Sequence, residues 1–400
     1  MYSHVRYFYI FVVMNIVLFD DPYIRTSLLP LTFTRPVAEI RVGILKISEK
    51  WEKRFDKVSF KTQNYLNAKY PQTASSDTLF VNGAVCPSSD LVALINGLDN
   101  DESLWSGERL IACHDLEVVD NSRKIQFEGD LVIVDKVWKV FKLNRTEIKK
   151  DFVLLTAGRK SMAIDDPHTV VYGSENIFVE EGATIKAAII NAESGPVYIG
   201  KNVDIQEGAI IHGSHAFCEG SVVNMGAKMR GDSTVGPYSK VGGEVSNSVI
   251  FGFSNKGHDG FLGNSVLGEW CNLGADTNTS NLKNDYGDVK LWDYNKPGFA
   301  NSGEMFCGLI MGDHSKAGIN TMFNTGTVVG VSSNIFGSGY SRNFIPSFAW
   351  GGAGGFSTYQ LRKVFTVAEK VMQRRKVVFD EAEKNILETV FNQTAEHRIW

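Results

Sequence analysis

The chain has 400 residues and a formal net charge of −4. Because a single hydrophobic core seldom extends beyond about 250–300 residues, this length predicts two or three domains. The sequence has no basic stripe or tail, so we expect small-molecule substrates rather than nucleic acid. Its five cysteines are scattered without a CxxC pair. This pattern argues against a disulfide framework and a cysteine zinc site, and it favours a reducing, cytoplasmic compartment.

The stretch Tyr7–Phe19 is almost wholly apolar and has the length of a signal-peptide hydrophobic region. It lacks a small-residue cleavage site, and Asp20 and Asp21 follow directly. It is also shorter than the roughly 20 residues that a membrane-spanning helix needs. We therefore predict a buried first strand at 15–19, with residues 1–13 as an N-terminal extension and no membrane association. A signal peptide is the alternative.

Mixed strand and helix signals follow, and they predict an α/β domain over residues 14–165. Short apolar runs bounded by turn residues predict buried strands at Leu79–Gly83, Arg109–Cys113 and Asp130–Asp135. Between the first two runs, Ser88–Leu98 is predicted to be a helix, with Ser88 or Ser89 as its N-cap.

From residue 166 to about 345 the sequence follows a period of six residues. Apolar residues recur at Ile199, Ile205, Ile211, Phe217, Val223, Met229, Val235 and Val241. The residue four positions after each is small or β-branched, except His215. This period fits neither an α-helix nor a simple strand, and it is typical of a parallel β-helix built from hexapeptides.

The period is interrupted in two places, and the chain ends in helices. It falters over Asn247–Phe261 and stops over Thr279–Glu304, then resumes from Met305 to Ile335. Since loops that leave a rigid scaffold often carry function, we expect the functional site near these interruptions. Over 346–400 we predict helices capped by Ser357 and Asp380, which cover the open end of the β-helix or make a subunit contact.

His258 lies at the interruption and has the chemistry of a general base. An imidazole ordinarily titrates near pH 6.5, which suits removal of a proton from an attacking amine or hydroxyl. A lone histidine is more often structural, so the surrounding motif decides its interpretation.

That motif resembles the acetyltransferase half of the bifunctional N-acetylglucosamine-1-phosphate uridyltransferase/glucosamine-1-phosphate N-acetyltransferase family. The segment KGHDGFLG supplies Lys256, His258 and Phe261, and CNLGADT supplies Asn272, followed by Asn281. In KMRGDSTVG an arginine, Arg230, is similar to the family's phosphate-binding arginine. The resemblance covers residues 171–337.

The resemblance implies a left-handed β-helix and homotrimers whose active sites lie between subunits. It also implies that the protein acetylates an amino-sugar 1-phosphate similar to glucosamine 1-phosphate, and that His258 is the general base of this reaction. Substrate contacts would come from Arg230, Lys256, Phe261 and Asn272, and acetyl-CoA contacts from Asn281, Lys283 and Lys290. The sequence departs from the family pattern at three positions. Ser246 stands where the family has a lysine, Phe261 where it has a tyrosine, and Asp276 where it has a glycine.

The front domain resembles a reduced branch of sugar-1-phosphate nucleotidyltransferases, through Ile16–Glu52 and Val81–Leu91. The glycine-rich phosphate loop of the full enzymes is missing, because Asp20–Leu29 contains no glycine. Arg25 and Arg35 remain as candidate nucleotide ligands. Activity here would require Mg²⁺, whose carboxylate ligands among Asp20, Asp21 and Asp135 stay unassigned.

Three other interpretations remain open. In the first, the protein is a sugar-1-phosphate nucleotidyltransferase that makes a UDP-sugar, and its β-helix is only an oligomerisation or regulatory module. In the second, the whole chain is a trimeric scaffold without enzymatic activity. In the third, the protein binds zinc as the hexapeptide carbonic anhydrases do, through His212, His215 and His258.

Overall fold

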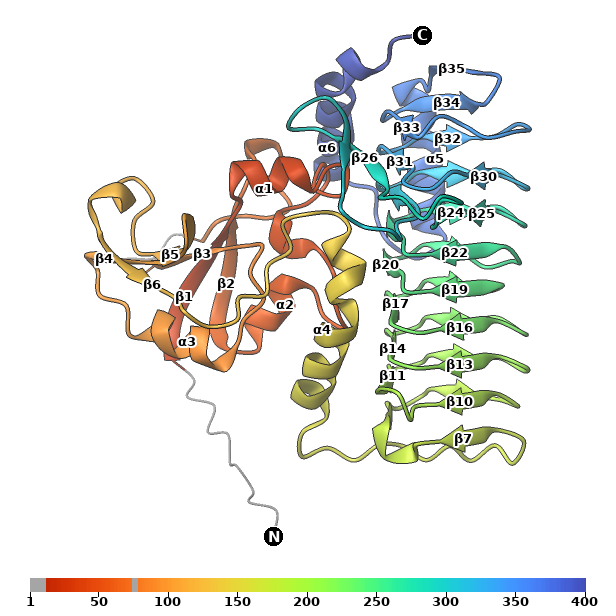
Figure 1. Ribbon diagram of the computed structural model, residues 1–400, viewed down its shortest axis with the longest axis horizontal. Coiled ribbons are helices and arrows are strands. Elements are labelled where there is room, and N and C mark those ends of the chain that lie inside the picture. The colour runs from red at the N-terminus through yellow and green to blue at the C-terminus, as the bar shows by residue number, and fades with distance from the viewer. Residues whose placement is uncertain (1–11, 74–77) are drawn as a thin grey trace.

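The computed structural model describes residues 12–73 and 78–400 of the chain. An α/β domain stands beside a tall parallel β-helix, and two C-terminal helices lie next to both (Figure 1). The architecture predicted from the sequence, an α/β domain followed by a left-handed parallel β-helix and C-terminal helices, is confirmed.

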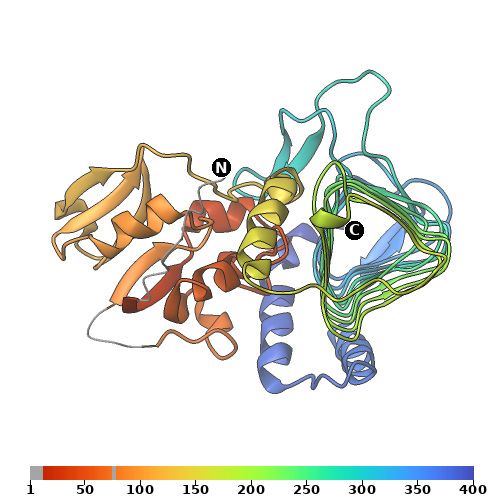
Figure 2. The same cartoon turned by 90° about the horizontal axis from the view of Figure 1, so that it is seen from below.

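The front domain is built on one mixed sheet with the strand order β2-β1-β3-β5-β4-β6. Its strands are β1 (Val12–Phe19), β2 (Phe55–Lys61), β3 (Thr78–Asn82), β4 (Glu102–Ser106), β5 (Arg109–Cys113) and β6 (Arg123–Gln126). Its helices are α1 (Pro22–Ser27), α2 (Ile47–Glu52), α3 (Ser89–Asn96) and α4 (Lys139–Thr156). The long helix α4 lies between this sheet and the β-helix (Figure 2).

Most elements predicted for the front domain are confirmed. Strands β1, β3 and β5 form where the apolar runs indicated, and Ser88 caps α3. The strand predicted at Asp130–Asp135 is wrong: only Ile133 pairs, as an isolated bridge to Val85. Strand β1 begins at Val12, so residues 12 and 13 belong to the sheet and not to an extension. Residues 1–11 of the predicted extension lie outside the described residues. No helix in the described ranges is long and apolar enough to span a bilayer.

The β-helix has three faces that meet at the corners of a triangular prism (Figure 2). The first face comprises β7 (Val170–Tyr172), β10 (Ile189–Asn191), β13 (Ile210–His212), β16 (Lys228–Arg230), β19 (Glu244–Ser246) and β22 (Phe261–Gly263), with β25 (Asn278–Thr279) and β30 (Met322–Phe323) pairing beyond them. The second comprises β8 (Ile177–Val179), β11 (Val197–Ile199), β14 (His215–Phe217), β17 (Ser233–Val235), β20 (Val249–Gly252), β23 (Val266–Glu269), β28 (Ile310–Met311), β31 (Val328–Val329) and β33 (Phe344–Ile345).

The third face comprises β9 (Thr184–Ile185), β12 (Asp204–Ile205), β15 (Val222–Val223), β18 (Lys240–Val241), β21 (Asn255–Lys256), β24 (Asn272–Leu273), β29 (Lys316–Ala317), β32 (Asn334–Ile335) and β34 (Ala349–Gly352). We call the edge between the first and second faces corner A. Corner B joins the second and third faces, and corner C joins the third and first.

The six-residue ladder explains the prism. All eight apolar residues from Ile199 to Val241 point into its interior and are buried, because each third hexad returns to the same face one coil higher. Ile199 thus pairs with Phe217, and Phe217 with Val235. Burying this continuous column holds the short strands together, since no single coil has a core of its own.

The first interruption shortens the coils and sends no loop out of the prism. Val235 pairs with Ile250 and Val241 pairs with Lys256, fifteen residues on instead of eighteen. Pairing on all three faces continues through this region. Residues have therefore been lost from the corners while the strands stay in register.

The second interruption is an excursion at corner A that carries a hairpin, β26 (Lys290–Asp293) and β27 (Gly298–Asn301). It packs against the front domain: Asn295 donates a hydrogen bond to Ser27 (2.8 Å), and Glu304 pairs with Lys142 of α4 (2.6 Å). Met305 is exposed, so the expectation that the ladder restarts there is wrong; the inward column resumes at Leu309 and Met311.

The C-terminal segment begins with a hairpin, in which β35 (Gly355–Thr358) pairs with β34. Two helices follow, α5 (Leu361–Gln373) and α6 (Glu381–Gln393). Asp380 caps α6 as predicted, whereas Ser357 lies in β35 and caps no helix. The helices pack alongside corner B and the front domain, in a cluster with Trp270, Phe348 and Phe33. They do not form the end cap that the sequence predicted; instead Phe356 of the hairpin packs against the interior of the β-helix.

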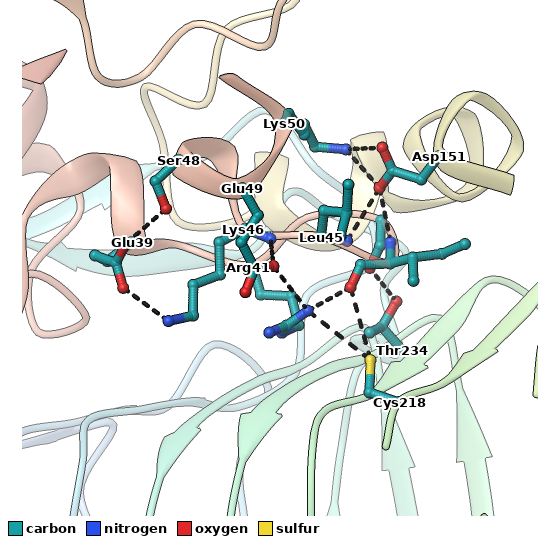
Figure 3. A network of polar contacts seen from close by, with 12 residues as sticks. Glu39, Arg41, Leu45, Lys46, Ser48, Glu49, Lys50, Asp151, Cys218 and Thr234 are labelled. Carbon is teal, nitrogen blue, oxygen red and sulfur yellow. Dashed lines mark hydrogen bonds and ion pairs between the residues drawn. The ribbon is translucent and has the colours of Figure 1, made fainter. Parts of the chain in front are cut away.

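The second face is covered by the front domain, and the two share one hydrophobic core. Residues of this face and of the excursion join the core of the front domain, namely Val249, Phe251, Val266, Val289, Leu291, Cys307, Ile310 and Val328. Polar contacts surround this core (Figure 3). Thr234 donates to the Gly43 carbonyl (2.9 Å), and Asp151 of α4 accepts from the Ile44 amide (2.9 Å) and pairs with Lys50 (2.5 Å). The two domains are therefore one packed unit.

Candidate functional site

A pocket of about 770 Å³ lies on the third face, between corners B and C and beneath the end of α5. Its lining includes His258 at corner C, Asn272 on the face itself and Trp270 at corner B. Small residues of the shortened coils also line it, together with Val371 of α5 and the two arginines that follow this helix, Arg374 and Arg375. The structure thus brings together two of the predicted site residues, His258 and Asn272.

The shortened coil places His258 at the mouth of this pocket. The histidine lies in the tight bend that follows β21 and is exposed. Glycine is required at this bend: Gly260 has φ +108°, and a Cβ there would lie 2.2 Å from the Thr277 carbonyl oxygen. Among the described residues, none hydrogen-bonds the His258 imidazole, so both of its nitrogens are open to a ligand.

Lys256 supports this bend from inside the prism. It occupies the inward position that Val241 fills one coil earlier, and its side chain is buried. Its ammonium donates to the carbonyls of His258 (2.5 Å), Asp259 (3.1 Å) and Gly242 (3.3 Å). Burial lowers the pKa of Lys256 to about 8. The substrate contact expected for Lys256 is therefore corrected: the ammonium binds the backbone that carries His258.

Asn272 belongs to an outward column of polar residues on the third face. Lys240, Asn255, Asn272 and Lys316 are successive partners in the parallel ladder. Asn255 donates to the Asn272 side chain (3.4 Å) and accepts from Arg375, two residues beyond the end of α5 (3.3 Å). This chain of amides ties the C-terminal helix to a predicted substrate ligand.

The other predicted ligands of the β-helix lie on the first face and at corner A. Arg230 is exposed and pairs with Glu244 (2.9 Å), and its strand neighbour is Ser246, where the family has a lysine. Phe261 and Asn281 lie together over Gly263, since a Cβ there would meet the Phe261 ring at 2.5 Å and the Asn281 amide at 2.7 Å.

Lys283 and Lys290 line a separate cavity of about 950 Å³ at corner A. Aromatic residues of the excursion and the last coils also line this cavity, including Trp292 and Phe344, which stack at 4.0 Å. The predicted set is thus divided between two corners of one prism. A single site can use both groups only if corner A of one copy meets corner C of another.

In the front domain, the two candidate nucleotide ligands are buried in structural contacts. Arg25 donates to the Thr32 carbonyl (2.7 Å) and to Tyr65 (2.8 Å) and lies beside Asp20 (3.4 Å). Arg35 is 2% exposed and forms ion pairs with Asp313 and Glu269 of the β-helix. The nucleotide-binding roles expected for both arginines are corrected, because these contacts hold the guanidinium groups away from solvent.

The candidate carboxylates of this domain are also engaged. Asp20 accepts hydrogen bonds from the Val37 amide (2.8 Å) and from Thr62 (2.5 Å), and burial raises its pKa. Asp21 caps α1, and Asp135 pairs with Lys139 (2.7 Å). We find no arrangement of these three side chains around a common point.

The histidines considered for zinc face different surroundings. His215 lies inside the prism, where burial lowers its pKa to about 4, whereas His212 is exposed on the first face and His258 lies at corner C. In the described part of the chain, no group of three histidine, cysteine or acidic residues is placed to hold a metal ion.

Several residues of the third-face pocket were missed from the sequence. Lys240, Asn255 and Lys316 each precede an inward hexad residue, so the register alone places them in one outward column with Asn272. Arg374 and Arg375 carried no such signal, because their place depends on how α5 docks.

Comparison with known proteins defines the class of the front domain first. Residues 16–160 match the sugar nucleotidyl transferase family, so the resemblance seen in the sequence is confirmed for this domain. The match covers the front domain and not the β-helix.

Curated relatives then extend the resemblance. A bifunctional protein GlmU from Methanocaldococcus jannaschii is 37% identical over 87 residues, which is 22% of this chain and 21% of the relative. A bifunctional sugar-1-phosphate nucleotidylyltransferase/acetyltransferase from Sulfurisphaera tokodaii is 34% identical over 93 residues, 23% of each chain. The chain therefore matches about a fifth of the length of these relatives.

Among solved structures, the UDP-N-acetylglucosamine acyltransferase of Francisella novicida is 12% identical to this chain. The alignment covers 56% of this chain and 89% of the acyltransferase, with a TM-score of 0.30. At this TM-score the likeness carries no conclusion about activity.

Proposed function

We propose that the protein is a sugar-phosphate acetyltransferase whose reaction takes place at the third-face pocket. The acetyl group would move from acetyl-CoA to the amine of an amino-sugar 1-phosphate similar to glucosamine 1-phosphate. The observation that carries this proposal is an exposed histidine, without a hydrogen-bond partner in the described part of the chain, at the mouth of a pocket it shares with Asn272.

In the proposed reaction, His258 removes a proton from the acceptor amine as its nitrogen attacks the thioester carbonyl. The new C–N bond forms and the C–S bond breaks, and the proton held by the imidazole passes to the departing thiolate. Positioned general bases of this kind contribute about 10²–10⁴-fold to a rate. Asn272 and its amide neighbour Asn255 would orient the sugar through hydrogen bonds.

The second group of predicted ligands would act from a neighbouring copy. Arg230 would hold the acceptor phosphate, and Phe261 would contact the sugar. Asn281, Lys283 and Lys290 at corner A would bind acetyl-CoA, whose phosphates suit the two lysines. Because Lys283 and Lys290 lie at corner A and Arg230 ends its strand on the side of the first face toward that corner, away from His258, we propose that a homotrimer assembles complete sites where corner A meets corner C.

A second candidate function is nucleotidyl transfer by the front domain, which the family match favours. It would use a nucleoside triphosphate and Mg²⁺ and would leave the β-helix an oligomerisation or regulatory module. The buried contacts of Arg25, Arg35 and Asp20 weigh against it, since all three lie near the end of β1, where the phosphate loop of the family would lie.

Two assays on the full chain separate these functions. Incubation with acetyl-CoA and a panel of amino-sugar phosphates should release free thiol and give an N-acetylated sugar phosphate. Labelled nucleoside triphosphates with sugar 1-phosphates and Mg²⁺ should give no labelled nucleotide sugar. Thiol release without any acceptor, or nucleotide sugar without acetyl transfer, would reverse the assignment.

A further inference from the structure

The third-face pocket gathers positive charge without any counter-charge. Four of its lining residues are cations, namely Lys240, Lys316, Arg374 and Arg375, and none of the others is acidic. Within the described ranges, no carboxylate lies within ion-pair distance of any of the four, although the chain as a whole is acidic. Many other cations of the protein do have such partners, for example Arg230, Lys142 and Lys50.

Two of these cations are partly removed from water. Lys316 donates to the carbonyls of His314 (2.9 Å) and Trp270 (3.5 Å), and burial lowers its pKa. Burial and the neighbouring charge of Arg374 also lower the pKa of Arg375. Like charges held together in this way cost free energy, and a bound anion with several oxygens would offset that cost.

The position of the two arginines is fixed by the fold. Helix α5 buries Val364, Ala368 and Met372 against corner B and the rest of its cluster, so the end of the helix stays over the pocket. From there, Arg375 reaches Asn255, which in turn bonds to Asn272. The cations therefore lie on the same pocket wall as a residue of the proposed acetyl-transfer site.

We propose that Arg374 and Arg375, which directly follow α5, are ligands for the phosphate groups of a substrate of the His258 reaction, together with Lys240 and Lys316. This inference rests on the proposed function and adds residues that the sequence resemblance does not supply. The phosphate belongs either to the amino-sugar acceptor or to coenzyme A, and the two sources are separated below.

The kinetic test compares Arg374→Ala and Arg375→Ala with Arg362→Ala and Lys363→Ala, which alter exposed cations in the first turn of α5. Each enzyme is assayed with glucosamine 1-phosphate and glucosamine as acceptors, and with acetyl-CoA and S-acetylpantetheine as donors. Loss of a charge-assisted hydrogen bond predicts a KM about 10- to 100-fold higher for one phosphate-bearing substrate, and kcat little changed. The KM for its phosphate-free counterpart should stay the same.

The substrate whose KM responds identifies the source of the phosphate. If KM for every substrate stays within twofold of the wild type, or if the Arg362→Ala and Lys363→Ala variants respond equally, the proposal is overturned. Thermal unfolding of each variant excludes a loss that comes from misfolding.

A binding measurement tests the pocket separately from the reaction. Calorimetric titration of the full chain with inorganic pyrophosphate should show binding that weakens about 10-fold or more in Arg374→Ala and Arg375→Ala. If acetyl transfer fails with all acceptors while this binding is present and sensitive to both variants, the proposed function is wrong but the phosphate site stands. Pyrophosphate binding that is indifferent to both variants would remove the site.

Discussion

Lys256 holds the backbone of His258 from inside the prism: its ammonium lies 2.5 Å from the His258 carbonyl oxygen. The same ammonium binds the carbonyls of Asp259 and Gly242, so one buried cation closes the bend on which the proposed base is carried. A lysine fits this inward slot because the shortened coil turns three carbonyls toward it, and among the described residues those of His258 and Gly242 have no other donor.

Substituting this lysine should affect the chemical step more than substrate binding. Lys256→Met fills the slot but cannot bond the carbonyls, so the bend and its imidazole lose their fixed position. We expect kcat to fall about 10- to 100-fold, since a displacement of about 1 Å costs roughly that much, with KM within twofold. Steady-state kinetics measure both. Lys228→Met, at an exposed position on the first face, should behave as wild type; a large rise in KM for Lys256→Met would instead indicate a direct substrate contact.

Removing the Arg35 guanidinium should weaken the union of the two domains. Arg35→Met leaves Asp313 and Glu269 without their buried partner at the interface. Breaking one side of a buried ion pair costs about 3–5 kcal/mol, and urea unfolding should show a loss of that size. Arg362→Ala, on the exposed side of α5, serves as the control. A loss below about 1 kcal/mol would mean that the pair is not buried in solution.

The buried His215 predicts a stability that depends on pH. Burial lowers its pKa from about 6.5 to about 4, so the unfolded chain binds more protons than the folded one between these values. Stability therefore falls as the pH drops from 6.5 toward 4, by up to about 3 kcal/mol from this group. His215→Val should lose some stability at pH 7.5, where it gives up the stack on Phe217, but should show a smaller loss on acidification.

Unfolding by urea at pH 7.5 and pH 5 measures this difference. His212→Val, at an exposed position, is the control because its imidazole is hydrated in both states. Equal acid sensitivity of wild type and His215→Val would contradict the buried, neutral state of this imidazole.

Sharing of the site between copies can be tested by mixing inactive variants. His258→Ala lacks the proposed base at corner C, and Arg230→Ala lacks the phosphate ligand near corner A. In mixed trimers one intact corner C meets one intact corner A, so co-refolding or co-expression of the two variants should restore part of the activity. Light scattering checks the trimeric mass. If the mixture stays as inactive as its components although mixed trimers form, both residues act within one subunit or not at all.

The sequence predicted the β-helix well because its physical basis is local and periodic. Inward residues such as Ile199 and Phe217 repeat at a fixed interval, so the column they form follows from spacing alone. The caps of α3 and α6 were likewise visible, since Ser88 and Asp380 act on the amides three residues later.

Features that depend on packing between distant segments were not predictable in this way. Arg35 looked like a surface phosphate ligand because Asp313, its partner, lies 278 residues further along the chain. Lys256 looked like a substrate ligand because the shortening of the coil, which turns it inward, shows only in the strand register. Arg374 and Arg375, which follow α5, reach the pocket through the docking of the whole helix, which no local pattern records.

The most direct test of the central claim is the acetyl-transfer rate of His258→Ala beside that of His212→Ala. With acetyl-CoA and an amino-sugar 1-phosphate, the His258 variant should lose about 10²–10⁴-fold in kcat, or roughly 3–5 kcal/mol of transition-state stabilisation, while its thermal unfolding stays unchanged. The His212 variant, altered at an exposed histidine of the first face, should retain wild-type kcat. Near-normal turnover by a folded His258→Ala protein would contradict the assignment of the third-face pocket as the site of acetyl transfer.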